Sequence, residues 1–175
     1  MKEDKMICSA IFLVVPFCFS VAALSDLFSA TIPNRVSIVM LCSFLLIAPL
    51  MGLGFMSIAL HLLVGCIVFS ICLFCFAVNI MGGGDAKLLT TAAIWFGWDG
   101  SLLRFLLLVA IFGGVLAVVI LLIRGIVRVI PLLSVFMPRS FWMHNKIPYG
   151  IAISIGGFIV YPDSYLFQIA LSGIS

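Results

Sequence analysis

Two aspartates, Asp26 and Asp85, lie at the polar edges of long apolar runs and far apart in the sequence. Paired carboxylates can divide the acid and base steps of a hydrolysis, because one holds a proton while the other activates water. Each aspartate alone has another explanation, pairing with a basic residue or capping a helix, but neither explanation accounts for both. The two side chains can act together only if the fold brings them to one place.

Three consecutive glycines, Gly82, Gly83 and Gly84, come directly before Asp85. Because they carry no side chains, they would leave room for a substrate backbone to approach the carboxylate. The alternative is a flexible turn, and the glycine run by itself does not decide between the two.

The composition indicates a membrane protein. Of 175 residues, 65% are hydrophobic and only 9% are charged, which is more apolar surface than a soluble domain of this length can bury. Several apolar runs approach the roughly 20 residues that a spanning helix needs. We therefore predict an all-α, polytopic membrane protein that forms one intramembrane domain over residues 1–175. The first run is interpreted as a transmembrane helix, because it lacks a convincing small-residue cleavage site.

The apolar runs predict six transmembrane helices joined by mostly short breaks. Their approximate ranges are 6–24, 37–54, 56–80, 84–98, 101–123 and 148–161. The connection 124–147, with Pro131 and Pro138, is expected to lie at the membrane surface. The tail after Asp163 is expected to be a short surface helix or disordered.

The basic residues predict the orientation, because cytoplasmic loops retain an excess of Lys and Arg. With six spans, Arg35, Lys87 and the basic residues of 124–147 share one side, so both termini are expected outside. This topology places Asp26 and Asp85 on the same, cytoplasmic, face. Asp85 should lie below the headgroups, because a helix from 85 to 98 rises only about 20 Å against a core of about 30 Å. Three aromatic side chains are expected at the outer interface: Trp95, Trp98 and Tyr161.

Other sites are disfavoured. The six cysteines lie inside apolar runs, and the single CxxC of Cys72 and Cys75 has no partner motif, so we predict packing rather than a metal site, redox site or disulfide. The net charge of +3 is too small and dispersed for nucleic-acid binding. His61 is expected to be a packing residue.

Supporting residues are also ambiguous. On a regular helix Lys87 points about 200° away from Asp85, so it is either a topology anchor or a substrate contact. Pro33 and Asn34 are expected to end a loop and start a helix. Tyr149 would either form a hydrogen bond near the aspartates or belong to the interfacial aromatic belt.

Three segments contain the two aspartates and the start of the last predicted helix: "GGGDAK", "SDLFSATIPNRVS" and "KIPYGIAISIGGF". Together they resemble the motifs of one family, the type IV prepilin peptidases. "GGGDAK" is similar to the family's GxGD signature, with Gly82, Gly84 and Asp85 on its fixed positions. "SDLFSATIPNRVS" resembles the first motif, in which an aspartate, here Asp26, precedes Ile-Pro-Asn. "KIPYGIAISIGGF" resembles the Pro-Tyr-Gly motif that opens the last helix, here Pro148, Tyr149 and Gly150.

This resemblance implies an intramembrane aspartic endopeptidase in the bacterial cytoplasmic (inner) membrane. Asp26 and Asp85 would be catalytic, with no metal or other cofactor. The partners would be membrane lipid and a pilin precursor, which has a basic leader ending at glycine before a hydrophobic helix. Cleavage would occur at the cytoplasmic face.

The length of the chain resembles that of the shorter members of the family. There is no room for the cysteine-rich insertion of the bifunctional enzymes, so the chain is similar to the peptidase-only form associated with tight-adherence (Tad/Flp) pili. Relatives commonly carry a basic residue soon after the first aspartate, whereas this chain has none before Arg35.

Two other classes remain open. A proton-coupled transporter would also keep acids in the membrane and break its helices with glycine, but we see no clear repeat, and both acids fall near one face. A non-enzymatic subunit of a pilus or secretion assembly would tolerate mutation of both aspartates.

Overall fold

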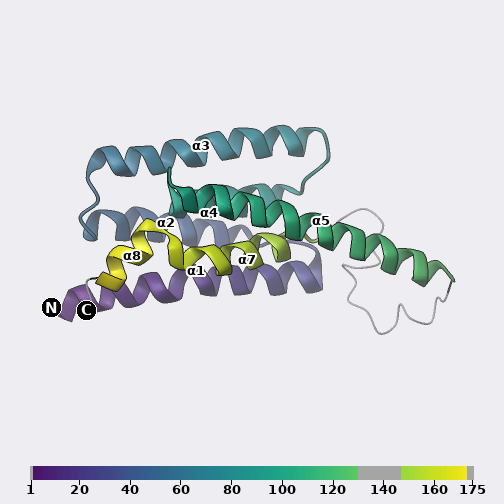
Figure 1. Ribbon diagram of the computed structural model, residues 1–175, viewed down its shortest axis with the longest axis horizontal. Coiled ribbons are helices and arrows are strands. Elements are labelled where there is room, and N and C mark those ends of the chain that lie inside the picture. The colour runs from purple at the N-terminus through teal and green to yellow at the C-terminus, as the bar shows by residue number, and fades with distance from the viewer. Residues whose placement is uncertain (1, 130–146, 173–175) are drawn as a thin grey trace.

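The computed structural model describes residues 2–129 and 147–172, and within these ranges the secondary structure is helical, without strands. Figure 1 shows the elements and their labels. The helices are α1 (Lys2–Ser29), α2 (Asn34–Leu50), α3 (Phe55–Ala77), α4 (Gly83–Phe96), α5 (Gly100–Val129), α7 (Tyr149–Val160) and α8 (Tyr165–Ser172), with a 3-10 turn η2 (Tyr161–Asp163) before α8. The predicted all-α fold class is confirmed.

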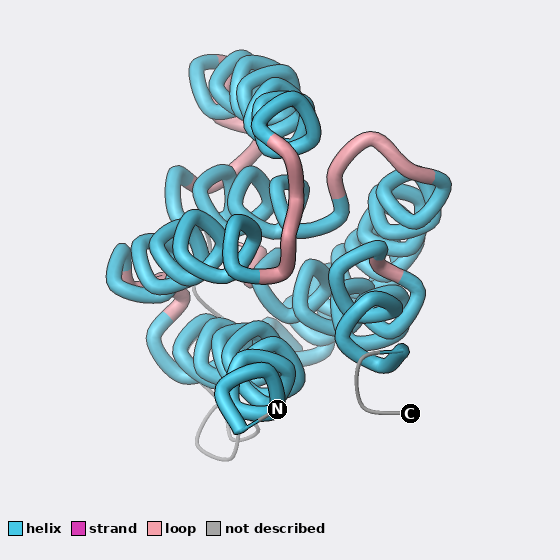
Figure 2. The backbone as a smooth tube through the Cα atoms, turned by 90° about the vertical axis from the view of Figure 1, so that its left-hand side faces the viewer, coloured by secondary structure: helices cyan, strands magenta, loops and turns pink. Residues whose placement is uncertain are grey.

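Helix α4 is the central element. It packs against α2, α3 and α7, while α1 packs against α2 and α7, and α5 packs against α7 (Figures 1 and 2). Most side chains of α4, from Asp85 to Phe96, are buried, although the helix has only 14 residues. Because most of its side chains are buried, α4 is surrounded mainly by protein rather than by lipid. Its length is about 21 Å at 1.5 Å per residue.

The helix boundaries follow local backbone chemistry. At the end of α3, the Ile80 N–H donates to the Cys75 carbonyl (2.9 Å) and the Asn79 N–H donates to the Phe76 carbonyl (3.0 Å). Asn79 has a φ of 59°, which completes the left-handed helix stop called a Schellman motif. Pro33 precedes the first residue of α2, as predicted, and its φ of −63° suits a helix start.

Three helices are long and apolar enough to cross a membrane: 9–29, 55–77 and 100–127. The segments 149–163 and 165–172, bent by 44° relative to each other, could together form a fourth span. The six predicted runs are all helices, but the count of six crossings, with both termini outside, stays a prediction.

The structure corrects one expectation about the connections and decides between the two alternatives for the tail. Helix α5 continues to Val129, so the start of the predicted surface connection is helical, and Pro131 and Pro138 lie outside the described residues. Residues 165–172 of the tail form the short helix α8, as one of the two alternatives predicted, and its Tyr165 and Leu171 are exposed. Its other side packs into the protein, because Leu166 and Ala170 are fully buried and α8 contacts α1.

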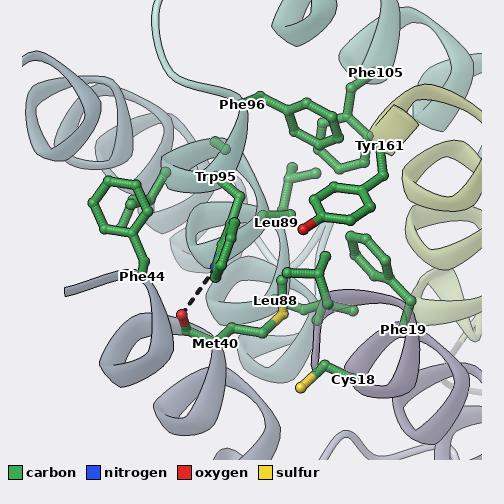
Figure 3. Close-up of a cluster of buried hydrophobic side chains, with 14 of the residues drawn as sticks. Cys18, Phe19, Met40, Phe44, Leu88, Leu89, Trp95, Phe96, Phe105 and Tyr161 are labelled. Carbon is green, nitrogen blue, oxygen red and sulfur yellow. Dashed lines mark hydrogen bonds between the residues drawn. The ribbon is translucent and has the colours of Figure 1, made fainter. Parts of the chain in front are cut away.

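Figure 3 shows a cluster of buried hydrophobic side chains in the core. It includes two aromatic residues that were expected at the outer membrane interface, so that expectation is wrong for them. Trp95 and Tyr161 are fully buried and pack edge to face against each other. The Trp95 Nε1–H donates to the Met40 carbonyl (2.9 Å), and the Tyr161 hydroxyl donates to the Ile11 carbonyl (2.9 Å). These side chains therefore satisfy their polar atoms inside the protein rather than among headgroups. Trp98 is exposed, as a membrane-interface residue requires.

Replacing Tyr161 by Phe should lower the free energy of unfolding by about 1 kcal/mol, because it removes one buried hydrogen bond and keeps the ring. Thermal unfolding in detergent measures this loss. Tyr165→Phe is the control, since Tyr165 is exposed. Equal unfolding temperatures for the two variants would contradict the assignment.

Candidate active site

Residues near several helix ends line a cavity of about 720 Å³. The ends of α1 and α3 and the start of α7, which contribute to it, lie at the end of the bundle away from α8 (Figure 1). The cavity walls come from the end of α1, the loop after it, the end of α3, the start of α4, the end of α5 and the start of α7. The lining residues are Asp26, Ala30, Thr31, Ile32, Asn34, Phe76, Asn79, Ile80, Met81, Gly82, Gly83, Gly84, Asp85, Arg124, Ile147 and Tyr149. The fold therefore brings both candidate carboxylates to one cavity.

Asp26 lies in the last turn of α1, and its side chain is 4% exposed. Its Oδ2 accepts a hydrogen bond from the backbone N–H of Gly150, with an N–O distance of 2.7 Å. Gly150 is the second residue of α7, where backbone N–H groups have no partner within the helix. The positive end of the helix dipole also favours a carboxylate at this position. The Pro-Tyr-Gly segment, predicted as support, thus reaches the first aspartate through the backbone of its glycine.

Asp85 lies in the first turn of α4 and is 7% exposed. Its side chain turns back toward the start of the helix, since a Cβ at position 82 would lie only 2.7 Å from Asp85 Oδ2. Both carboxylates consequently lie at helix N-termini, Asp26 at that of α7 and Asp85 at that of its own helix.

The three glycines have different surroundings. A Cβ at position 84 would lie 3.2 Å from Ile32 Cβ, whereas one at position 83 would meet only the Phe76 ring, at an ordinary 3.5 Å. Gly83 and Gly84 belong to α4, so the flexible-turn alternative is wrong for them. At positions 82 and 84 the absent side chain makes room for atoms of the protein itself. The role of the glycines in substrate approach stays a prediction.

Lys87 and Asn34 join two of the helices that border the cavity. The Lys87 Nζ donates to Asn34 Oδ1 (3.0 Å), which links the first turns of α4 and α2. The direction of the Lys87 side chain relative to Asp85 stays a prediction. Neither the topology role nor the substrate role of Lys87 follows from it.

Arg124, Phe76 and Asn79 are among the cavity residues that sequence reasoning did not predict as site residues. Arg124 was interpreted only as a topology marker, because the predicted helix ended at residue 123. The signal for Asn79 was available, since asparagine after an apolar helix is typical of a left-handed stop. Tyr149 lines the cavity, and its ring also packs beside Gly113 of α5.

Residues outside the cavity behave as packing residues. His61 is buried far along α3 from the cavity, and its Nδ1 lies 2.6 Å from the Ile94 carbonyl oxygen. Within the described ranges, Cys18, Cys42, Cys66, Cys72 and Cys75 are free thiols. Those ranges also hold no cluster of three His, Cys, Asp or Glu residues arranged for a metal ion.

Comparison with known families agrees with this geometry. A sequence model of the type IV leader peptidase family matches residues 13–122, which is more than half of the chain and includes both Asp26 and Asp85. No curated protein and no solved structure gives a match. The chain therefore belongs to the type IV leader peptidase family, and it is a membrane-embedded protease.

The glycines provide a direct test of the geometry. Gly82→Ala should lower peptidase activity by about 10²-fold, because the new Cβ displaces the Asp85 carboxylate by a distance on the order of 1 Å. Gly83→Ala should keep activity within about twofold, because its Cβ makes only an ordinary contact, and alanine favours the helix. Activity is measured as leader removal per folded protein. Similar activities for the two variants would contradict this description of the site.

Proposed function

We propose that this protein is an aspartic endopeptidase that removes the basic leader of Flp-like type IV prepilins at the cytoplasmic face of the inner membrane. The observation that carries the proposal is the meeting of two buried carboxylates, from α1 and α4, in one open cavity. Family membership supports the leader-peptidase activity. The aspartic mechanism, the substrate branch and the face of cleavage are our inferences.

The proposed chemistry needs one proton shared by the pair. Two close carboxylates do not easily both ionise, so one is protonated while the other is negative, and their titrations belong to the pair. The negative carboxylate takes a proton from water as the water oxygen attacks the scissile carbonyl carbon, and the protonated one donates to the carbonyl oxygen. The C–N bond of the tetrahedral intermediate then breaks as the first carboxyl passes its proton to the leaving amine. The second carboxylate takes back a proton from one hydroxyl group of the intermediate, which becomes the product carboxyl group, so the pair again shares one proton.

Shape supports a prepilin substrate, because the hydrophobic helix that follows the leader can remain in lipid beside the bundle while the cleavage site enters the cavity. A peptide bond must leave helical geometry before it is cut, and glycine at the cleavage position lowers that cost.

The distribution of charge supports cytoplasmic cleavage. Arg35, Lys87 and Arg124 lie at the cavity end of the bundle, whereas Asp99 and the exposed pair of Arg104 and Asp163 (3.2 Å) lie beyond the opposite ends of α4 and α7. By the positive-inside rule, the cavity end faces the cytoplasm.

The decisive variants are Asp26→Asn and Asp85→Asn. Each should lower cleavage of an Flp-like precursor by at least about 10²- to 10⁴-fold, because each removes an acid or base and keeps nearly the same shape. Asp163→Asn is the matched control, since it alters only an exposed pair at the other end of the molecule. Leader removal is followed by mass spectrometry with purified protein in detergent.

Normal cleavage by either dyad variant at wild-type folded level would refute the aspartic mechanism. A folded wild-type protein that does not cleave the precursor would instead favour the assembly-subunit alternative.

Orientation has a separate test. In a background without native cysteines, Arg35→Cys should react with an impermeant thiol reagent only from the cytoplasmic side, and Trp98→Cys only from the opposite side. Both positions are exposed. Reversed labelling in oriented vesicles would exclude cytoplasmic cleavage without affecting the assignment of the dyad.

A further inference from the structure

We propose that Ile32 is a positioning residue that sets the separation of the two aspartates. This inference rests on the proposed function, because it concerns the same dyad. Ile32 lies in the loop between α1 and α2 and is 9% exposed. Its side chain separates the first turns of α4 and α7, the two helix ends beside which the carboxylates lie.

The contacts of Ile32 are with two glycines. Its Cβ would lie 3.2 Å, and its backbone nitrogen 3.4 Å, from a Cβ placed on Gly84. Its Cδ1 would lie 2.7 Å from a Cβ placed on Gly150. Only hydrogen atoms at these two positions allow both helices to approach the isoleucine so closely.

Each glycine is coupled directly to one aspartate. Gly84 precedes Asp85 in the first turn of α4, and Gly150 donates its N–H to Asp26. A shift of Ile32 is therefore transmitted to both carboxylates, although the isoleucine itself has no group that can react.

The loop holds Ile32 in place from both sides. On one side, the Ala30 N–H donates to the Asp26 carbonyl (3.0 Å), and the Ser25 hydroxyl donates to the Thr31 carbonyl (2.8 Å). On the other side, Pro33 has a restricted φ, and Asn34 accepts from Lys87. The loop that carries Ile32 is therefore held by hydrogen bonds to the end of α1 and to the starts of α2 and α4.

Smaller side chains at position 32 should lower kcat with little change in KM. Ile32→Val removes Cδ1, the atom beside Gly150, and should lower kcat several-fold. Ile32→Ala keeps only Cβ, against Gly84, and should lower kcat by about 10²-fold, the order expected when catalytic groups move by about 1 Å. The measurement is steady-state cleavage of a prepilin by the full-length protein in detergent, per folded fraction.

Ile47→Val and Ile47→Ala are matched controls. Ile47 is 7% exposed, lies near the end of α2 that is remote from the Ile32 loop, and does not line the cavity. These variants lose comparable buried volume, so they should lower the unfolding temperature similarly and leave kcat per folded protein unchanged.

Unchanged kcat in both Ile32 variants would overturn the inference. So would kcat losses in the Ile47 variants equal to those in the Ile32 variants. A rise in KM at unchanged kcat in the Ile32 variants would also overturn it, because Ile32 would then be a substrate contact. If Ile32→Ala does not fold, Ile32→Val decides. Failure of the proposed function is distinguishable, because the Asp26→Asn and Asp85→Asn variants would then still cleave.

Discussion

The hydrogen bond from the Gly150 N–H to Asp26 Oδ2 connects two helices that lie far apart in the sequence. It joins the last turn of α1 to the first turn of α7, and both groups are buried. A buried carboxylate requires hydrogen-bond donors, since its uncompensated desolvation is expensive. A helix N-terminus provides them from the backbone, together with a favourable dipole. The end of α1 and the start of α7 must therefore meet for Asp26 to be tolerated where it lies.

The same constraint explains why glycine occurs beside both acids. A helix N-terminus can serve a carboxylate only if the two backbones approach closely, and any side chain at position 150 would meet Asp26 and Ile32. At α4, Gly82 leaves space for the carboxylate of Asp85, and Gly84 leaves space for Ile32. The glycines are thus structural requirements of the site as well as candidate points of substrate approach.

Away from the cavity, three buried aromatic side chains contact backbone carbonyls of neighbouring helices. Trp95 and Tyr161 donate to α2 and α1, and His61 contacts the carbonyl of Ile94 in α4. In a lipid environment, where apolar contact between helices provides little driving force, such hydrogen bonds and close packing hold helices in register. A well-ordered opposite end keeps α1, α4 and α7 aligned, and so stabilises the position of both aspartates.

The sequence by itself determined the helices and the end of the bundle at which both aspartates lie. Apolar runs must form helices in a bilayer, because every backbone polar group needs a partner, and the predicted alternation of crossings placed both aspartates at one end. Only the tertiary structure decided that Gly150 reaches Asp26, that Ile32 separates two glycines, that Arg124 lines the cavity and that Trp95 and Tyr161 are core residues. The reason is physical. In a helix that is apolar on all sides, the sequence pattern does not distinguish the side that faces lipid from the side that faces protein. Which sides of two helices pack together therefore depends on side-chain packing, which the periodicity of the sequence does not reveal.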